Sequence, residues 1–242
     1  MKKLGIIFFF VISIFSTLPA QKSYVVDTLN INDSLTQYNS GQWFKRTKPS
    51  SGLEGTGFIF EKFMTGQLLI NDTAISAERY LLNIDAYTNE VKYMEGNKEY
   101  TIYNTNKYTG VILKDSLQQR YLFKRIPLSP NNKTLYLAEV LYQGKKFVLY
   151  KYIEKRLHRA DLNDRGIVST GRNITSFDEY SEYYIKKQNA PLEKIKLKRS
   201  DFLALTVEIK LPQLEKYCIE HKIGKNLSDQ DAVQLISIIE NL

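Results

Sequence analysis

Alternating apolar and polar residues, in short runs joined by turn formers, fill the chain from Gly57 to Lys187 and constrain its fold more than any other feature. Between Tyr80 and Ala86 an apolar side chain recurs at every second position, which is the period of a strand with one buried face. Gln143-Gly144 is typical of a tight turn between two strands. Successive hairpins pair antiparallel, so the sequence predicts a mainly antiparallel β fold, a sandwich or an open barrel-like sheet, and not a parallel α/β sheet.

The last quarter of the chain changes to helical periodicity. Ser200 is suited to cap a short helix, Pro212 to the first turn of a second helix, and the Ser228–Asp231 segment to open a third helix as a capping box. The side chains expected on the inner faces are Leu214, Tyr217, Cys218 and His221 in the second helix, which we expect Gly224 to end, and Ala232, Leu235, Ile236 and Ile239 in the third. The predicted fold class is therefore α+β, with two to three short C-terminal helices that pack on one another and on the sheet.

Residues 1–20 have the order of charge and hydropathy of a cleaved secretory signal peptide. Two lysines precede an uncharged apolar run from Leu4 to Phe15, which is well short of the ~20 residues that a membrane-spanning helix needs. Ala20 suits the small pocket at the cleaved bond, so we expect the mature chain to begin at or near Gln21. An uncleaved membrane anchor is the alternative. We expect no lipoprotein anchor, because no cysteine adjoins the cleavage site, and no transmembrane segment in the mature chain.

The chain divides by composition into four segments. After the signal peptide, residues 21–56 are polar and rich in turn formers. We expect an extended lead-in there, with one strand around Gln42–Lys45 and with Trp43 docked on the main domain. Residues 57–197 are expected to form the antiparallel β domain, and residues 198–242 a helical region packed on it.

Charge gives only a weak indication of partners. Loss of residues 1–20 removes two lysines and no acids, so the formal net charge falls from +8 to +6. Basic and acidic residues are interleaved along most of the chain, as on a solvated surface. An acidic partner or an anionic lipid surface could use the densest basic run, although alternate lysines on the outer face of a strand explain it more simply. This run is Lys194, Lys196, Lys198 and Arg199. With export, we expect no nucleic acid partner.

Cys218 is the only cysteine, so the chain can form no internal disulfide and no cysteine-rich zinc site, and packing alone must hold the fold. His221 follows three residues later, a helical spacing that brings a thiol and an imidazole together, as a thiolate–imidazolium pair requires. Both residues lie on the stripe expected to face the sheet, however, and buried thiols are usually inert. His158 stands among cationic residues and is interpreted as a surface residue. We favour structural roles for Cys218 and His221, and no catalytic role for His158.

Three pairs of carboxylates are candidates for acid–base chemistry. They are Asp161 with Asp164, Asp178 with Glu179, and Asp229 with Asp231. Each pair lies in an expected turn or at a helix start, where short acids stabilise the backbone. The segment Asp161–Gly166 superficially resembles a calcium-binding loop but lacks the regular ligand spacing and the distal glutamate. Phosphate-binding loops, nucleophile elbows and His-Glu-x-x-His motifs are also missing from the sequence. We therefore assign no catalytic, cofactor-binding or metal-binding residue, and we expect no cofactor.

Tyrosine is unusually frequent, at 17 of 242 residues. Its ring offers a flat apolar face and a polar tip, which suits binding surfaces, but tyrosine is also an ordinary strand residue. Both interpretations stay open: an exposed tyrosine platform for a ligand, and plain packing within the sheet. The tyrosines in or beside expected strands are Tyr80, Tyr87, Tyr93, Tyr100, Tyr103, Tyr108, Tyr121, Tyr136, Tyr142, Tyr150 and Tyr152.

The order of features resembles that of a group of small exported proteins of unknown function, abundant in Bacteroidota-type Gram-negative bacteria. The resemblance spans residues 54–242 and rests on a glycine-led opening strand at Glu54–Phe58, the stretch Arg79–Val91, the hairpin Glu139–Lys151, a lysine-rich strand and two terminal helices. The opening strand departs from the group in having Phe58-Ile59 in place of an aromatic-leucine-asparagine run. The resemblance implies a fold and an exported location. Because the group has no established activity, it implies no site residue.

These observations favour a non-enzymatic, exported binding or interaction module, periplasmic, outer-membrane-associated or secreted, whose partner is an envelope protein or a glycan. The basis is a tyrosine-rich β protein without a recognisable catalytic set. The competing hypothesis is a hydrolase or isomerase whose carboxylates come from distant parts of the sequence. A shallow aromatic face would favour the binding module, and two carboxylates that converge in a deep pocket would favour the enzyme.

Overall fold

The computed structural model describes residues 53–102, 108–129, 133–160, 163–164, 169–170, 174–206 and 210–241, all within the unit Phe44–Leu242. Side chains are described for these residues except 75–80, 163–164 and 169–170. The expected signal peptide, the expected strand at Gln42–Lys45 with Trp43, and the side chains of the Asp161–Gly166 loop lie outside the described residues.

The described chain is mostly strands. In chain order these are β1 (Leu53–Glu54), β2 (Met64–Ile70), β3 (Thr73–Asp85), β4 (Glu90–Glu95), β5 (Lys98–Thr101), β6 (Gly110–Lys114), β7 (Arg120–Pro127), β8 (Leu135–Gln143), β9 (Phe147–His158), β10 (Asn163–Asp164), β11 (Ser169–Thr170), β12 (Thr175–Lys187) and β13 (Leu192–Ile195). Eleven of them form one sheet in the order β1-β12-β9-β8-β7-β6-β2-β3-β4-β5, with β13 also paired to β12, while β10 and β11 pair separately. Neighbours in the large sheet are antiparallel except β1 and β12, which run parallel. The predicted mainly antiparallel α+β fold is confirmed.

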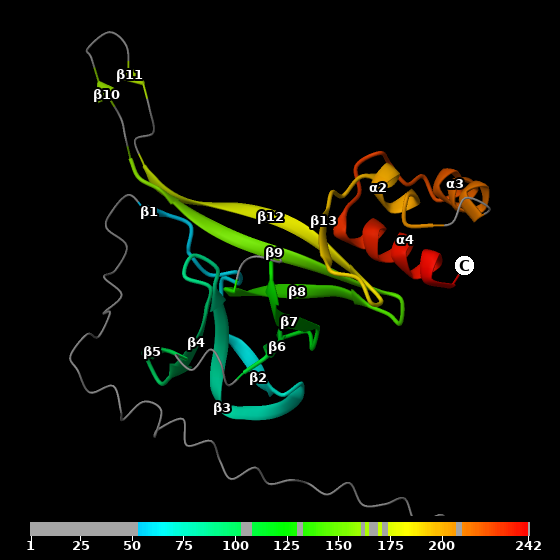
Figure 1. Ribbon diagram of the computed structural model, residues 1–242. Helices are drawn as coiled ribbons and strands as arrows, with labels where there is room; N and C mark the ends of the chain where they lie inside the picture. The colour runs from blue at the N-terminus through cyan, green and yellow to red at the C-terminus, as the bar shows by residue number, and fades with distance from the viewer. Residues whose placement is uncertain are drawn as a thin grey trace, which may run out of the picture. The chain divides into compact units, whose positions relative to one another are not determined.

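The strands β9 and β12 pair along almost their whole length. Their register holds from His158 opposite Ser176 to Phe147 opposite Lys187. Figure 1 shows the two strands side by side, with the helices near one end and the β10–β11 hairpin beyond the other. Side chains on both faces of this two-stranded ribbon are therefore held in one register along its whole length.

The turn between β3 and β4 is inserted between the start of β8 and the later part of β9. The Asn89 side chain donates to the Leu135 carbonyl oxygen at 3.0 Å and accepts from the Leu137 N–H at 2.9 Å. The Lys155 N–H donates to the Ala86 carbonyl oxygen at 3.3 Å. Because β7, β6 and β2 lie between β8 and β3 in the sheet order, these contacts show that the sheet curls back on itself in the manner of an open barrel.

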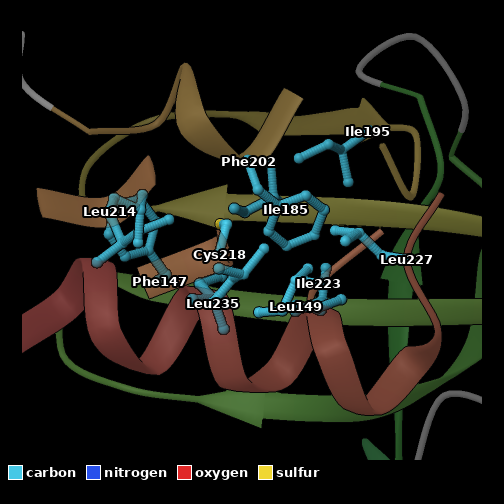
Figure 2. Packing of buried hydrophobic residues seen from close by; sticks show 13 residues of the cluster. Phe147, Leu149, Ile185, Ile195, Phe202, Leu214, Cys218, Ile223, Leu227 and Leu235 are labelled. Atoms are coloured by element: carbon cyan, nitrogen blue, oxygen red, sulfur yellow. The ribbon is translucent and has the colours of Figure 1, made fainter. Parts of the chain in front are cut away.

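Three helices cover one face of the sheet: α2 (Arg199–Leu203), α3 (Leu211–Glu220) and α4 (Asp229–Asn241). In Figure 2, Leu149 and Ile185 of the sheet lie against Cys218 of α3 and Leu235 of α4. The buried cluster consists of Phe147, Leu149, Ile185, Ile195, Phe202, Leu214, Cys218, Ile223, Leu227, Ala232, Leu235, Ile236 and Ile239. We call this side of β9 and β12 the helix face. Among the described residues, no helix is both long and apolar enough to cross a bilayer.

The opposite side of the same strands forms a second buried cluster. Tyr150 and Tyr152 of β9 and Tyr184 of β12 pack there with Ile126 of β7 and Ala138 of β8. We call this side the tyrosine face. Successive strand residues point to opposite faces. The faces of Leu149 and Tyr150 therefore determine the face of all remaining residues of β9 and, through the strand register, of β12.

The starts of α3 and α4 agree with the local sequence, whereas the start of α2 and the end of α3 do not. Pro212 lies in the first turn of α3, as predicted. The capping box of α4 is present: the Asp231 N–H donates to Ser228 Oγ at 3.1 Å, and the Ser228 N–H donates to Asp231 Oδ2 at 3.0 Å. The prediction that Ser200 caps α2 is wrong, because the helix begins at Arg199. The Arg199 N–H is instead bound by the Lys225 carbonyl oxygen at 2.9 Å, so a distant segment fixes this helix start.

The prediction that Gly224 ends α3 is also wrong. The helix ends at Glu220, and Lys222 takes the left-handed conformation with φ 54°. The Ile223 N–H then donates to the Cys218 carbonyl oxygen at 2.8 Å, which satisfies one of the free carbonyls at the helix end. Burial of Ile223 in the helix-face cluster holds this turn in place.

Candidate functional site

Cys218 and His221 are not brought together as a catalytic pair. Cys218 is only 1 % exposed and lies in the helix-face cluster, where burial raises the pKa of its thiol. The expected buried position of His221 is wrong: the residue is exposed just past the last turn of α3, and its ring stacks on Tyr217 with 3.8 Å between ring centroids. A neutral, buried thiol is a packing group and not a nucleophile.

The carboxylates Asp178 and Glu179 lie on opposite faces of β12 and therefore do not act on one substrate atom. Asp178 Oδ2 lies 3.3 Å from His158 Nε2. Glu179 Oε2 lies 2.6 Å from Lys155 Nζ. Each acid thus belongs to a cross-strand charge pair between β12 and β9.

Asp229 and Asp231 are close in sequence but have separate roles at the start of α4. Asp231 accepts from the Ser228 N–H and hydroxyl, and these hydrogen bonds hold the pKa of its carboxyl below the usual range. Asp229 instead turns to the sheet, where Oδ2 lies 2.7 Å from Lys151 Nζ and Oδ1 accepts from the Tyr183 hydroxyl at 2.7 Å.

Asp229 completes a polar cluster on the helix face that sequence reasoning missed. Glu139, Lys151 and Tyr183 stand directly opposite one another across β8, β9 and β12. Burial raises the pKa of Glu139, and the positive charge of Lys151 opposes this rise. The pKa of Tyr183 is raised by burial and by its hydrogen bond to Asp229. The cluster could not be read from spacing, because its members come from three strands and a helix.

An open hollow lies beside the β8–β9 turn, and a carboxylate of the protein itself forms part of its lining. Its lining residues are Gln143, Gly144, Lys145, Lys146, Glu240 and Asn241. Glu240 accepts from the Lys145 and Lys146 N–H groups and from the Tyr142 hydroxyl. A Cβ on Gly144 would collide with this carboxylate, which explains the glycine in the turn. The contact fastens the end of α4 to the hairpin.

Packing explains part of the expected tyrosine platform. Of its members, Tyr93, Tyr108, Tyr150 and Tyr152 are buried, whereas Tyr87 is 53 % exposed. Burial raises the pKa of Tyr152 to about 12, and Glu154 adds to the rise. Tyr80 and Tyr103 lie outside the described side chains. The platform interpretation therefore narrows to the few tyrosines that solvent reaches.

Tyr180, which is not among the tyrosines expected in the platform, lies in an exposed charged strip on the tyrosine face of β9, β12 and β13. Tyr180 is 39 % exposed, and the Arg156 guanidinium lies 4.4 Å from its ring centroid. Arg156 also pairs with Glu154 at 2.7 Å, and Lys194 of β13 pairs with Glu182. Solvent reaches 52 % of the Arg156 side chain and 58 % of the Lys194 side chain. We call these five residues the charged tyrosine strip.

No protein-family model, curated protein or solved structure matches this chain. Among the described side chains, no group of three or more histidine, cysteine or acidic residues is arranged to hold a metal ion. The fold and its surfaces define a mainly antiparallel α+β protein with a helix-covered face and a two-stranded ribbon that is exposed over part of its length.

Proposed function

We propose that the protein is an exported, non-enzymatic binding module that recognises an envelope protein or a surface glycan through the charged tyrosine strip. The observation that carries the proposal is the exposed Tyr180 ring, which lies under Arg156 on the paired strands β9 and β12. Tyrosine and arginine are the side chains most often found at the energetic centre of interfaces.

The strip places charges of both signs around the Tyr180 ring. Arg156 pairs with Glu154, and Glu182 accepts from both Lys194 and the Tyr184 hydroxyl. Exposed ion pairs of this kind are weak, so their charged groups stay available to a partner. The resemblance to exported bacterial proteins and the signal-like residues 1–20 support the proposed location outside the cytoplasm.

Capture from an envelope extract tests this function. The immobilised protein is expected to retain a specific protein or glycan, and Tyr180→Ala or Arg156→Ala should lower its recovery about tenfold, as truncation of a central interface residue does. Leu117→Ala is the matched control, because Leu117 is 85 % exposed on the β6–β7 turn, away from the strip. Equal recovery on all four proteins would contradict the proposal.

The polar cluster on the helix face favours a second candidate, a hydrolase or isomerase. Glu139 is a half-buried carboxyl with a raised pKa beside Lys151 and Asp229, and such groups are common among general acids and bases. Glycoside, ester and prolyl-isomer substrates should then be turned over by the protein and not by Glu139→Gln. Turnover that is equal in the two proteins would exclude Glu139 as the catalytic acid.

A further inference from the structure

The outer edge of β12 is open in its middle. β1 pairs with this edge only at Thr175–Ser176, and β13 only from Tyr183 to Lys186. Between these two ends, no strand of the described chain lies alongside β12 on this edge. Figure 1 shows β13 beside only the part of β12 that is near the helices.

The direction of the backbone groups follows from the neighbouring strand. The Gln188 N–H donates to the Lys146 carbonyl oxygen at 2.8 Å, so at this position β12 turns its backbone groups to β9. In an antiparallel pair, every second residue directs its N–H and C=O groups to the neighbouring strand. The backbone groups of Tyr180 and Glu182 therefore face β9, and those of Glu179 and Ser181 face outward. The Lys155 N–H, opposite Glu179, bonds to Ala86 and not to β12, in agreement with this assignment.

Solvent reaches this part of the strand from both faces. Glu179, Tyr180 and Ser181 are three consecutive exposed residues in β12. The stretch from Asp178 to Glu182 contains three acids and no basic residue. Each acid has a basic neighbour on an adjacent strand, His158, Lys155 or Lys194, but the Glu179 side chain stays 46 % exposed. Proline and lysine, which often protect exposed edges from added strands, do not occur in this stretch, and the charges that do occur are all acidic.

We propose that the outer edge of β12 at Glu179–Glu182 binds an extended, basic peptide segment of the partner by β-strand addition. The outward N–H and C=O groups of Glu179 and Ser181 supply the main-chain hydrogen bonds. In an antiparallel arrangement, peptide residues opposite Glu179 and Ser181 lie on the helix face, where the Glu179 carboxylate attracts lysine or arginine. The residue between them lies opposite Tyr180, where an apolar side chain packs on the ring. The expected recognition pattern is therefore basic–apolar–basic.

This inference rests on the proposed binding function and identifies its ligand class. The probe is a labelled hexapeptide of alternating lysine and valine, measured by fluorescence anisotropy against the whole protein. Two peptides serve as controls: alternating glutamate and valine, and the lysine–valine peptide with N-methylated backbone amides. The lysine–valine peptide is expected to bind, and both controls to bind at least about tenfold more weakly.

The protein variants are Ser181→Pro and Ser181→Ala. Proline removes only the outward N–H, so the ladder to β9 stays intact, and Ser181→Pro is expected to weaken peptide binding about tenfold while Ser181→Ala does not. Should circular dichroism show Ser181→Pro unfolded, Glu179→Lys replaces it, with the same expected loss for the lysine–valine peptide.

Failure of the lysine–valine peptide to bind would overturn the inference, as would equal binding of the acidic peptide or equal binding to the folded edge variant. The outcome is separable from that of the proposed function. An envelope partner that is lost on Tyr180→Ala but retained on Ser181→Pro would leave the binding function in place and remove the strand addition.

Discussion

Lys151 and Asp229 join the centre of the sheet to the first residue of the last helix, with 2.7 Å between Nζ and Oδ2. The pair is half-buried, and Tyr183 adds a hydrogen bond from a third element. It therefore orients α4 on the helix face, in addition to the apolar packing.

Asp229→Asn is expected to lower the free energy of unfolding by about 1–3 kcal/mol, because it leaves the Lys151 ammonium half-buried without its counter-charge. Chemical denaturation at neutral pH measures this. Glu193→Gln, which breaks the exposed Lys187 pair, is the matched control and should cost under about 1 kcal/mol. Equal losses of unfolding free energy in the two variants would show that the half-buried Asp229–Lys151 pair stabilises the fold no more than an exposed pair does.

Ile236→Asp is expected to abolish the soluble folded protein. Ile236 is 0 % exposed in the helix-face cluster, and a buried unpaired charge costs several kcal/mol. Ile219→Asp is the control, because Ile219 is 73 % exposed on α3. Soluble expression and circular dichroism distinguish the two variants.

Truncation after Lys210 removes α3 and α4 and should also prevent folding. The loss would expose Leu149 and Ile185 of the sheet, which α3 and α4 help to cover. A truncated protein with an unchanged melting temperature would show instead that the helices are an independent appendage.

Cys218→Ala is expected to cost about 1–2 kcal/mol through lost packing. Native Cys218 should resist thiol reagents until the protein unfolds, because it is buried and its thiol pKa is raised. Rapid labelling of the native protein would reopen the cysteine–histidine hypothesis.

Stability is expected to fall as the pH rises above about 10. Tyr152 has a folded pKa of about 12 against 10.0 for an ordinary tyrosine, so the unfolded chain loses this proton first and its free energy falls relative to that of the folded state. Tyr152→Phe should remove a part of the fall on the order of 1–2 kcal/mol at pH 11.5. Denaturation curves between pH 8 and 11.5 test this, and identical pH profiles would contradict it.

Mass spectrometry of the envelope fraction is expected to find a chain that starts at or near Gln21. The small residue Ala20 after an apolar run is the reason for this position. Recovery of the protein from the membrane with Met1 still present would contradict cleavage.

The sequence predicted those features that depend on neighbouring residues. Ser228 and Asp231 are three residues apart, so their capping box could be recognised directly. The hairpin at Gln143-Gly144 joins β8 to β9 in the same way. The start of α2 could not be predicted, because the Lys225 carbonyl that binds its first N–H is distant in sequence.

The candidate surfaces depend still more on distant contacts. The charged tyrosine strip needs the register that places Tyr180 opposite Glu154, and the open edge needs β13 to leave β12 after Ile195. Alternation of apolar residues predicts strands but not their partners, so neither surface could be located from the sequence. The polar cluster of Glu139, Lys151 and Asp229 could not be predicted for the same reason.

The pairing of β1 with β12 has a consequence for the order of folding. Leu53 finds its partner only at Thr175, so the first described strand has no place in the sheet until most of the chain has been synthesised. Closing so long a loop costs entropy before the contact stabilises anything, and folds with such distant pairings form slowly. The strand β1 can therefore join the sheet only after β12 is in place, whereas each hairpin between them needs only its own two strands.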